Sequence, residues 1–184
     1  MKATGIVRRI DDLGRVVIPK EIRRTMRIRE GDPLEIYTDR EGEVIFKKYS
    51  PIGELASFSS QYAETLQKIC SMAVVITDRD AVIASAGVSK KEYSERKVSY
   101  EMEKIMEKRA LYVHREGSDK ITVIEGGNSH FVSCAMPIIS EGDIIGSVCS
   151  VIPEGDSGER KLSEEVETKL IQTAANFLSR QIEA

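Results

Sequence analysis

The first 50 residues of this 184-residue chain constrain its fold more than any other feature, because they contain four short β-type runs and one short helix. Turn-forming residues at 11–14 and 39–42 separate the runs in pairs. The expected strands are residues 5–10, 15–18, 34–38 and 43–47, and the expected helix is residues 19–27. A segment of this size buries little apolar surface alone. We therefore expect residues 1–50 to dimerise, with their edge strands as the route.

Positive charge is concentrated at the N-terminal end of a chain whose net charge is −3. Residues 1–50 carry 12 basic and 9 acidic side chains, a net of +3, whereas residues 51–184 carry 15 basic and 21 acidic, a net of −6. Residues 1–29 alone reach a net of +6, with 9 basic against 3 acidic side chains. Such asymmetry predicts a segment that faces nucleic acid, attached to a part that does not.

The basic side chains of this segment gather around one turn and one helix. On a helical wheel, Ile22 and Met26 lie on the side that we expect to be buried, and the basic side chains of the helix point away from it. These residues are Lys20, Arg23, Arg24 and Arg27 on the helix, and Arg8, Arg9 and Arg15 around the turn. Phosphates of double-stranded DNA would relieve the repulsion among them, and arginine also makes bidentate contacts to phosphate and to guanine. A solvated charged helix face is the alternative.

A long motif in this segment resembles the swapped-hairpin DNA-binding domain of the AbrB family. It comprises TGIVR at residues 4–8, DLGRVVIP at residues 12–19 and EIRRT at residues 21–25. The resemblance implies a mainly-β, barrel-like core built by two interleaved chains. It also implies contact with double-stranded, A/T-rich DNA through Arg8, Arg9, Arg15, Arg23 and Arg24. The same fold serves antitoxins, which carry a toxin-binding tail that we do not find in this chain.

The rest of the chain predicts an α+β domain, an antiparallel sheet with flanking helices, over residues 56–184 after a linker at residues 51–55. Apolar residues recur every three or four positions in both its first and its last helix. The expected helices are residues 54–69, 99–109 and 163–182. The expected strands are residues 72–77, 81–86, 110–114, 121–125, 131–139 and 144–152, the last two forming a hairpin.

The hairpin sequences AMPII at residues 135–139 and IGSV at residues 145–148 are similar to those of GAF domains. We expect Gly146 to allow a close backbone approach. With both parts together, the whole chain resembles the stage V sporulation protein T family, regulators of sporulation genes in spore-forming bacteria. The resemblance implies a tetramer, a dimer of swapped-hairpin dimers, with pairing through helices 54–69 and 163–182. Whether the GAF-like domain senses a small molecule or is purely structural stays open.

Composition limits the other function classes. No run of about 18 apolar residues occurs and no apolar stretch follows Lys2, so we expect neither a membrane span nor a secretory signal. Three cysteines, Cys70, Cys134 and Cys149, indicate a reducing cytoplasm. His114 and His130 are the only histidines, so we expect no metal site, no cofactor and no catalytic residues. A GAF-type redox enzyme that uses the cysteines is a further alternative.

Overall fold

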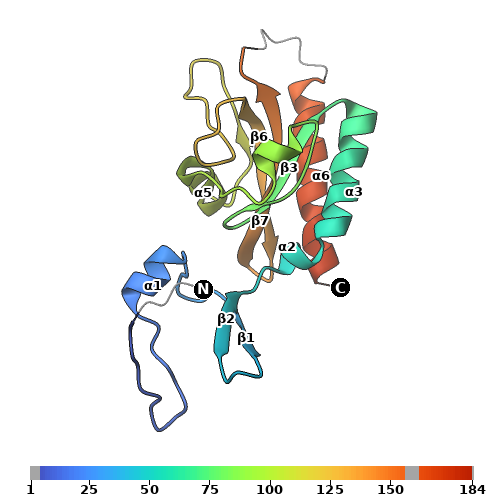
Figure 1. Ribbon diagram of the computed structural model, residues 1–184. Coiled ribbons are helices and arrows are strands. Elements are labelled where there is room, and N and C mark those ends of the chain that lie inside the picture. The colour runs from blue at the N-terminus through green and yellow to red at the C-terminus, as the bar shows by residue number, and fades with distance from the viewer. Residues whose placement is uncertain (1–4, 156–161, 184) are drawn as a thin grey trace. The chain divides into compact units, whose positions relative to one another are not determined.

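The computed structural model describes residues 5–155 and 162–183 (Figure 1). Thr4, the first residue of the AbrB-like motif, lies outside the described residues. The chain divides into two compact units, Met1–Tyr49 and Ser50–Ala184.

The N-terminal unit contains one helix, α1 (Lys20–Thr25), and two strands, β1 (Leu34–Thr38) and β2 (Val44–Lys48). The strands pair antiparallel with Leu34 opposite Lys48, as the sequence predicts to within one residue. The carboxylate of Asp39 accepts hydrogen bonds from the backbone N–H groups of Glu41 (3.0 Å) and Glu43 (2.8 Å). Gly42 takes the left-handed backbone conformation, with φ of 85°. Turn chemistry local to residues 39–43 therefore sets this hairpin.

The strands expected at residues 5–10 and 15–18 are not formed in the single chain. The segment is an open loop that leads into α1 (Figure 1). Two backbone hydrogen bonds close the turn between the two runs, from the Asp11 N–H to the Arg15 carbonyl (3.1 Å) and from the Gly14 N–H to the Asp11 carbonyl (3.0 Å). A strand needs a neighbour for its N–H and C=O groups, and these runs do not supply one to each other. The single chain therefore does not form the two expected strands, and their pairing across a swapped-hairpin dimer stays a prediction.

The C-terminal unit is built on a five-stranded antiparallel sheet with the order β4-β3-β7-β6-β5. Its strands are β3 (Ala73–Asp78), β4 (Val82–Ala86), β5 (Tyr112–Val113), β6 (His130–Ser140) and β7 (Asp143–Pro153). Its helices are α2 (Pro51–Glu54), α3 (Ala56–Cys70), α4 (Lys90–Tyr93), α5 (Tyr100–Glu107) and α6 (Glu164–Ile182). The antiparallel sheet with flanking helices confirms the predicted α+β class.

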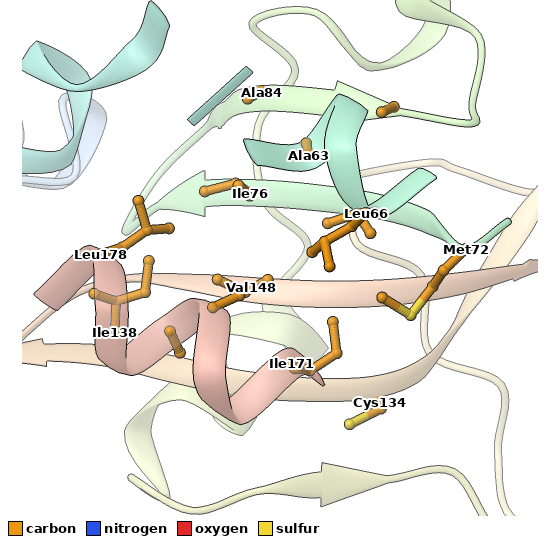
Figure 2. Close-up of a cluster of buried hydrophobic side chains, with 14 of the residues drawn as sticks. Ala63, Leu66, Met72, Ile76, Ala84, Cys134, Ile138, Val148, Ile171 and Leu178 are labelled. Atoms are coloured by element: carbon orange, nitrogen blue, oxygen red, sulfur yellow. The ribbon is translucent and has the colours of Figure 1, made fainter. Parts of the chain in front are cut away.

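Helices cover both faces of this sheet. The long helices α3 and α6 lie side by side on one face, and α5 lies on the other (Figure 1). In Figure 2, Leu66 of α3 and Ile171 and Leu178 of α6 meet side chains of the central strands, such as Val148. A second buried cluster lies on the α5 side. No helix in the described part of the chain has both the length and the apolar character to cross a bilayer.

The expected linker at residues 51–55 is instead the start of the C-terminal unit. Ser50 caps α2, because its hydroxyl accepts a hydrogen bond from the Gly53 N–H (3.2 Å), and Pro51 occupies the first turn. The Ser50 hydroxyl also donates to Asp78 Oδ2 (3.0 Å). Ile52 is fully buried in the core under α3 and α6. Burial of one isoleucine thus makes this Pro- and Gly-containing stretch part of the fold.

Two other local expectations differ from the structure. Residues 121–125 form no strand, and only an isolated bridge joins Ile124 to Val98. The short helix α4, which we did not predict, follows Ser89 and buries Tyr93. In both places tertiary packing on the α5 face determines the backbone conformation, which no periodic pattern in the sequence predicts.

Gly146 on β7 allows the backbones of β7 and β3 to approach closely, as expected. A Cβ atom at this position would lie 2.0 Å from the carbonyl oxygen of Thr77. That separation is far inside van der Waals contact, and the obstacle is backbone in the middle of a sheet. A side chain at position 146 can be accommodated only if the two strands move apart.

We predict that Gly146→Ala lowers the free energy of unfolding of the C-terminal unit by about 2–4 kcal/mol, because strand separation disturbs a packed core. Urea unfolding followed by circular dichroism measures this change. Asp143→Ala, at the exposed start of the same strand, is the matched control and should change stability by less than about 0.5 kcal/mol. Equal stability of the two variants would contradict the predicted clash.

Candidate nucleic-acid interface

A tight turn at residues 11–15 positions the first group of arginines. The Asp11 carboxylate accepts hydrogen bonds from the backbone N–H groups of Leu13 (3.0 Å) and Arg15 (2.8 Å). It also accepts from Nε of Arg15 at 2.8 Å, in an exposed ion pair. The Arg15 N–H and guanidinium together lower the pKa of Asp11 below its usual range. Arg15 therefore lies at the surface with part of its charge already paired.

Arg8 and Arg9 lie in the open run before this turn, and both side chains are exposed. Val7 and Ile10, which flank them, are also exposed, at 87% and 69% of their full surface. This run thus presents charged and apolar side chains to solvent together. Exposure of this kind is unusual for a stable surface and shows that the run lacks a covering partner in the single chain.

Helix α1 positions the second group of arginines. Pro19 precedes the helix, and its buried ring and fixed φ start it. Arg23 and Arg24 lie in the last turn, where their charge complements the helix dipole, and both are exposed. Ile22 is half-buried on the opposite side, as the helical wheel predicts. Met26 was expected beside it in the buried layer, but it is 57% exposed.

Arg27 does not extend the charged face of α1, contrary to the wheel. The helix ends before it, and Arg27 has the left-handed backbone φ of 52°. Its carbonyl oxygen accepts a hydrogen bond from Nζ of Lys48 on β2 (2.9 Å). Asp32, whose side chain is 4% exposed, holds the same ammonium group at 3.3 Å and also accepts from the Arg29 N–H (2.8 Å). No local motif in the sequence predicts the contacts of Lys48 with Arg27 and Asp32, because these residues are far apart along the chain.

Apolar side chains that one chain leaves uncovered dominate the N-terminal unit. Among the apolar residues at positions 5–49, Pro19 alone is buried. Twelve of the sixteen exposed large apolar side chains in the described chain belong to this unit. They are Ile6, Val7, Ile10, Leu13, Val16, Val17, Met26, Ile36, Tyr37, Val44, Ile45 and Phe46. The arginines therefore sit on a framework that is incomplete as a monomer.

A second uncovered surface lies on the outer side of α3 and α6. Phe58 and Tyr62 of α3 and Phe177 of α6 form an aromatic cluster, with ring centroids 5.7–6.5 Å apart. Phe177 is 39% exposed, and Ile69 and Val166 on the same two helices are more exposed still. The inner sides of these helices pack on the sheet. Their outer sides together form an aromatic and aliphatic strip.

The cysteines do not form a reactive group. Cys134 packs in the cluster under α3 and α6, whereas Cys149 packs on the α5 side. They occupy neighbouring strands, where Cys149 pairs with Ala135, so their side chains point to opposite faces. Burial raises the pKa of Cys149 to about 12, against a small opposing effect of a hydrogen bond with Ser147. Both thiols are fully buried, and that of Cys149 is protonated near neutral pH.

Two family models cover almost all of the chain. The model of the stage V sporulation protein T C-terminal domain, described as a transcription factor, matches residues 54–183. The model of bacterial MazE antitoxins, described as antidote–toxin recognition, matches residues 7–53. The boundary between the two matches falls close to the division between the compact units.

Individual proteins agree with both matches. Stage V sporulation protein T of Bacillus subtilis is 50% identical over 184 residues, covering all of this chain and 99% of that protein. The N-terminal DNA recognition domain of the Bacillus subtilis transition-state regulator AbrB is 65% identical over 28% of this chain and 94% of that structure, with a TM-score of 0.24. A GAF domain from a Coxiella burnetii phosphoenolpyruvate-protein phosphotransferase is 14% identical over 70% of this chain and 82% of that structure, with a TM-score of 0.50, and supports the fold alone. The chain therefore belongs to the stage V sporulation protein T family of transcription factors.

Proposed function

We propose that this protein is a cytoplasmic, double-strand DNA-binding regulator of sporulation genes. The observation that carries the proposal is the exposed arginine set, Arg8, Arg9, Arg15, Arg23 and Arg24, in a unit closely similar to an AbrB DNA recognition domain. These guanidinium groups dock on phosphates and on base edges. The assignment to sporulation rests on stage V sporulation protein T, to which this chain is 50% identical. A/T-rich sequences, whose narrow minor groove attracts arginine, are the preferred DNA.

The DNA-binding unit works as a swapped-hairpin dimer. Residues 5–10 and 15–18 have β-type sequences, yet they lack strand partners within one chain. A second copy supplies those partners and covers the apolar side chains that residues 5–49 leave exposed. Two copies also double the number of arginines along one surface. Residues 7–53 match the model of MazE antitoxins, while residues 54–183 match a transcription-factor domain, which favours a regulator over an antitoxin.

The C-terminal units join two such dimers into a tetramer. The strip around the half-buried Phe58 and Tyr62 and the exposed Phe177 is the pairing surface, because aromatic side chains are typical centres of protein interfaces. A tetramer carries two DNA-binding heads, and linked heads gain avidity without new contacts. The net charge of −6 on residues 51–184 disfavours DNA binding by this part of the chain.

The GAF-like unit also senses a small molecule in this proposal, with a purely structural role as the second candidate. A redox-enzyme function gains no support from the cysteines, since Cys134 and Cys149 are buried on opposite faces of the sheet. Retention of a ligand by the purified tetramer would favour sensing over the structural role.

Replacing Arg23 and Arg24 together by alanine should weaken binding to a labelled A/T-rich duplex by about tenfold or more, because phosphate or base contacts are lost. The slope of log affinity against log salt should become shallower by about 0.9 for each phosphate contact removed. Fluorescence anisotropy titrations at several salt concentrations between about 50 and 300 mM measure both the affinity and its salt slope.

The matched control for this pair is Arg40→Ala/Lys47→Ala, which removes two exposed positive charges from the β1–β2 hairpin. It should retain most of the affinity and the salt slope. If the wild type fails to bind at low salt, or the α1 variant and the control behave alike, the arginines of α1 are only a solvated face.

A second prediction concerns the ion pair at the turn. Asp11→Asn keeps a side-chain oxygen for the N–H groups of Leu13 and Arg15 but removes the charge that holds the Arg15 guanidinium. DNA affinity should therefore rise several-fold and more than for Asp12→Asn, which removes an exposed charge without that contact. The same anisotropy titration compares them. A gain no larger for Asp11→Asn than for Asp12→Asn would place Arg15 away from the DNA.

A third prediction concerns assembly. The wild type should sediment as a tetramer, and Phe177→Arg should sediment as a dimer, because a charge in the aromatic strip opposes burial there. Asn176→Arg introduces the same charge at the neighbouring exposed position of α6 and should leave the tetramer intact. Analytical ultracentrifugation gives the masses. A tetramer in both variants would move the pairing surface away from α3 and α6.

A further inference from the structure

A hollow of about 370 Å³ lies where α5 ends beside β5, the edge strand of the sheet. Its apolar lining comes from Ile105 at the end of α5 and from Leu111, Tyr112 and Val113 on and before β5. Ile105 is almost fully buried, and the other three are half-buried. The volume falls at the small end of the range of ligand sites, which suits a compact metabolite.

The charge around this hollow is opposite to that of the unit that contains it. Lys108 and Arg115 line it, and none of its lining residues is acidic. Residues 51–184 as a whole carry a net charge of −6. Within the described part of the chain, neither of these two side chains takes part in an ion pair, whereas Lys104 one turn earlier is bound to Glu107 at 2.9 Å. Two cations beside an apolar floor form a site for an anion with an apolar body.

The backbone around the hollow is held from several sides. Tyr112 and Val113 pair with Ala135 and Cys134 of β6. Arg109, in the left-handed conformation at the end of α5, donates a hydrogen bond from its guanidinium to the Gly142 carbonyl (2.7 Å) at the β6–β7 turn. The shape therefore depends on ordered secondary structure. An edge strand of two residues is also too short to bind a peptide by strand addition, which favours a small molecule.

We infer that the hollow beside β5 is a binding site for small organic anions, carboxylates or phosphates, with an apolar body. The apolar part lies against Ile105 and Tyr112, which both belong to the α5 side of the sheet, and the anionic group meets Lys108 and Arg115. The inference deepens the sensing role of the proposed function and rests on it for biological meaning. β5 pairs with β6, and β6 packs under α6. A ligand bound in the hollow therefore lies close to the elements that carry the aromatic strip.

Fluorine NMR of the full-length protein tests the site without DNA. The probes are 4-fluorophenylacetate and 4-fluorophenyl phosphate, with 4-fluorophenylacetamide as the neutral counterpart. The wild type should broaden the signals of at least one anion with a dissociation constant on the order of 1 mM, as expected for ligands of this size. The amide should bind at least tenfold more weakly. The stronger of the two anions identifies carboxylate or phosphate as the preferred group.

Three variants locate the binding. Lys108→Gln/Arg115→Gln should weaken the anions about tenfold and leave the amide unchanged, because two charge-assisted contacts are lost. Lys91→Gln/Arg96→Gln removes the same charges from exposed positions outside the hollow and should bind as the wild type does. Ala110→Trp fills the hollow from an exposed lining position and should abolish binding of all three probes.

The inference is overturned if no probe binds the wild type at 10 mM, roughly ten times the expected dissociation constant. It is also overturned if the two charge variants bind equally, or if Ala110→Trp binds like the wild type. Thermal unfolding of each variant verifies that the fold is kept. DNA binding measured on the same preparations separates failure of this site from failure of the proposed function, since a regulator with a purely structural C-terminal unit would still bind DNA.

Discussion

The N-terminal unit cannot cover its own apolar side chains, and the architecture of the protein follows from this constraint. Among the apolar residues at positions 5–49, only Pro19 is buried within one chain. Chains of this length rarely form a sufficient core alone, and in the proposed function a second copy supplies the missing cover. In the proposed dimer, the two runs around the Asp11 turn become strands only when partner strands accept their hydrogen bonds. Folding, dimerisation and assembly of the arginine surface are then one event.

The C-terminal unit meets the opposite situation, because its sheet is covered on both faces. Cluster residues under α3 and α6 and those under α5 are almost all fully buried. This explains why β6 and β7 are nearly continuous runs of buried residues instead of alternating ones. It also explains why Cys134 and Cys149 are fully buried. Both proposed sites of the C-terminal unit, the strip on α3 and α6 and the hollow at the edge strand, therefore lie outside this core.

The two units carry opposite net charges and therefore interact differently with DNA. The positive N-terminal unit attracts DNA at long range, while the acidic C-terminal unit is repelled by it, so binding proceeds from one end. Within the positive unit the charges are moderated locally. Asp11 holds Arg15, and Asp32 and Lys48 secure the chain just after α1. The acidic residues near the arginines thus hold neighbouring groups in place, an effect that the net charge alone does not describe.

Sequence by itself determined the features that depend on local chemistry. Asp39 and Gly42 specify the β1–β2 hairpin, Pro19 specifies the start of α1, and polarity specifies the exposure of Arg23 and Arg24. The AbrB-like motif and the GAF-like hairpin were recognisable for the same reason, because each is a continuous run of residues.

Only the tertiary structure decided the features that depend on distant neighbours. Pro51–Glu54 form a helix because Ile52 reaches a core made with α3 and α6. Residues 5–10 and 15–18 stay open because no segment of the described chain pairs with them as a neighbouring strand. Cys134 and Cys149 face apart because register pairs Cys149 with Ala135, and a shift of one residue in a sheet reverses every side chain. Register and burial are set by the whole assembly of elements, so no local pattern contains them.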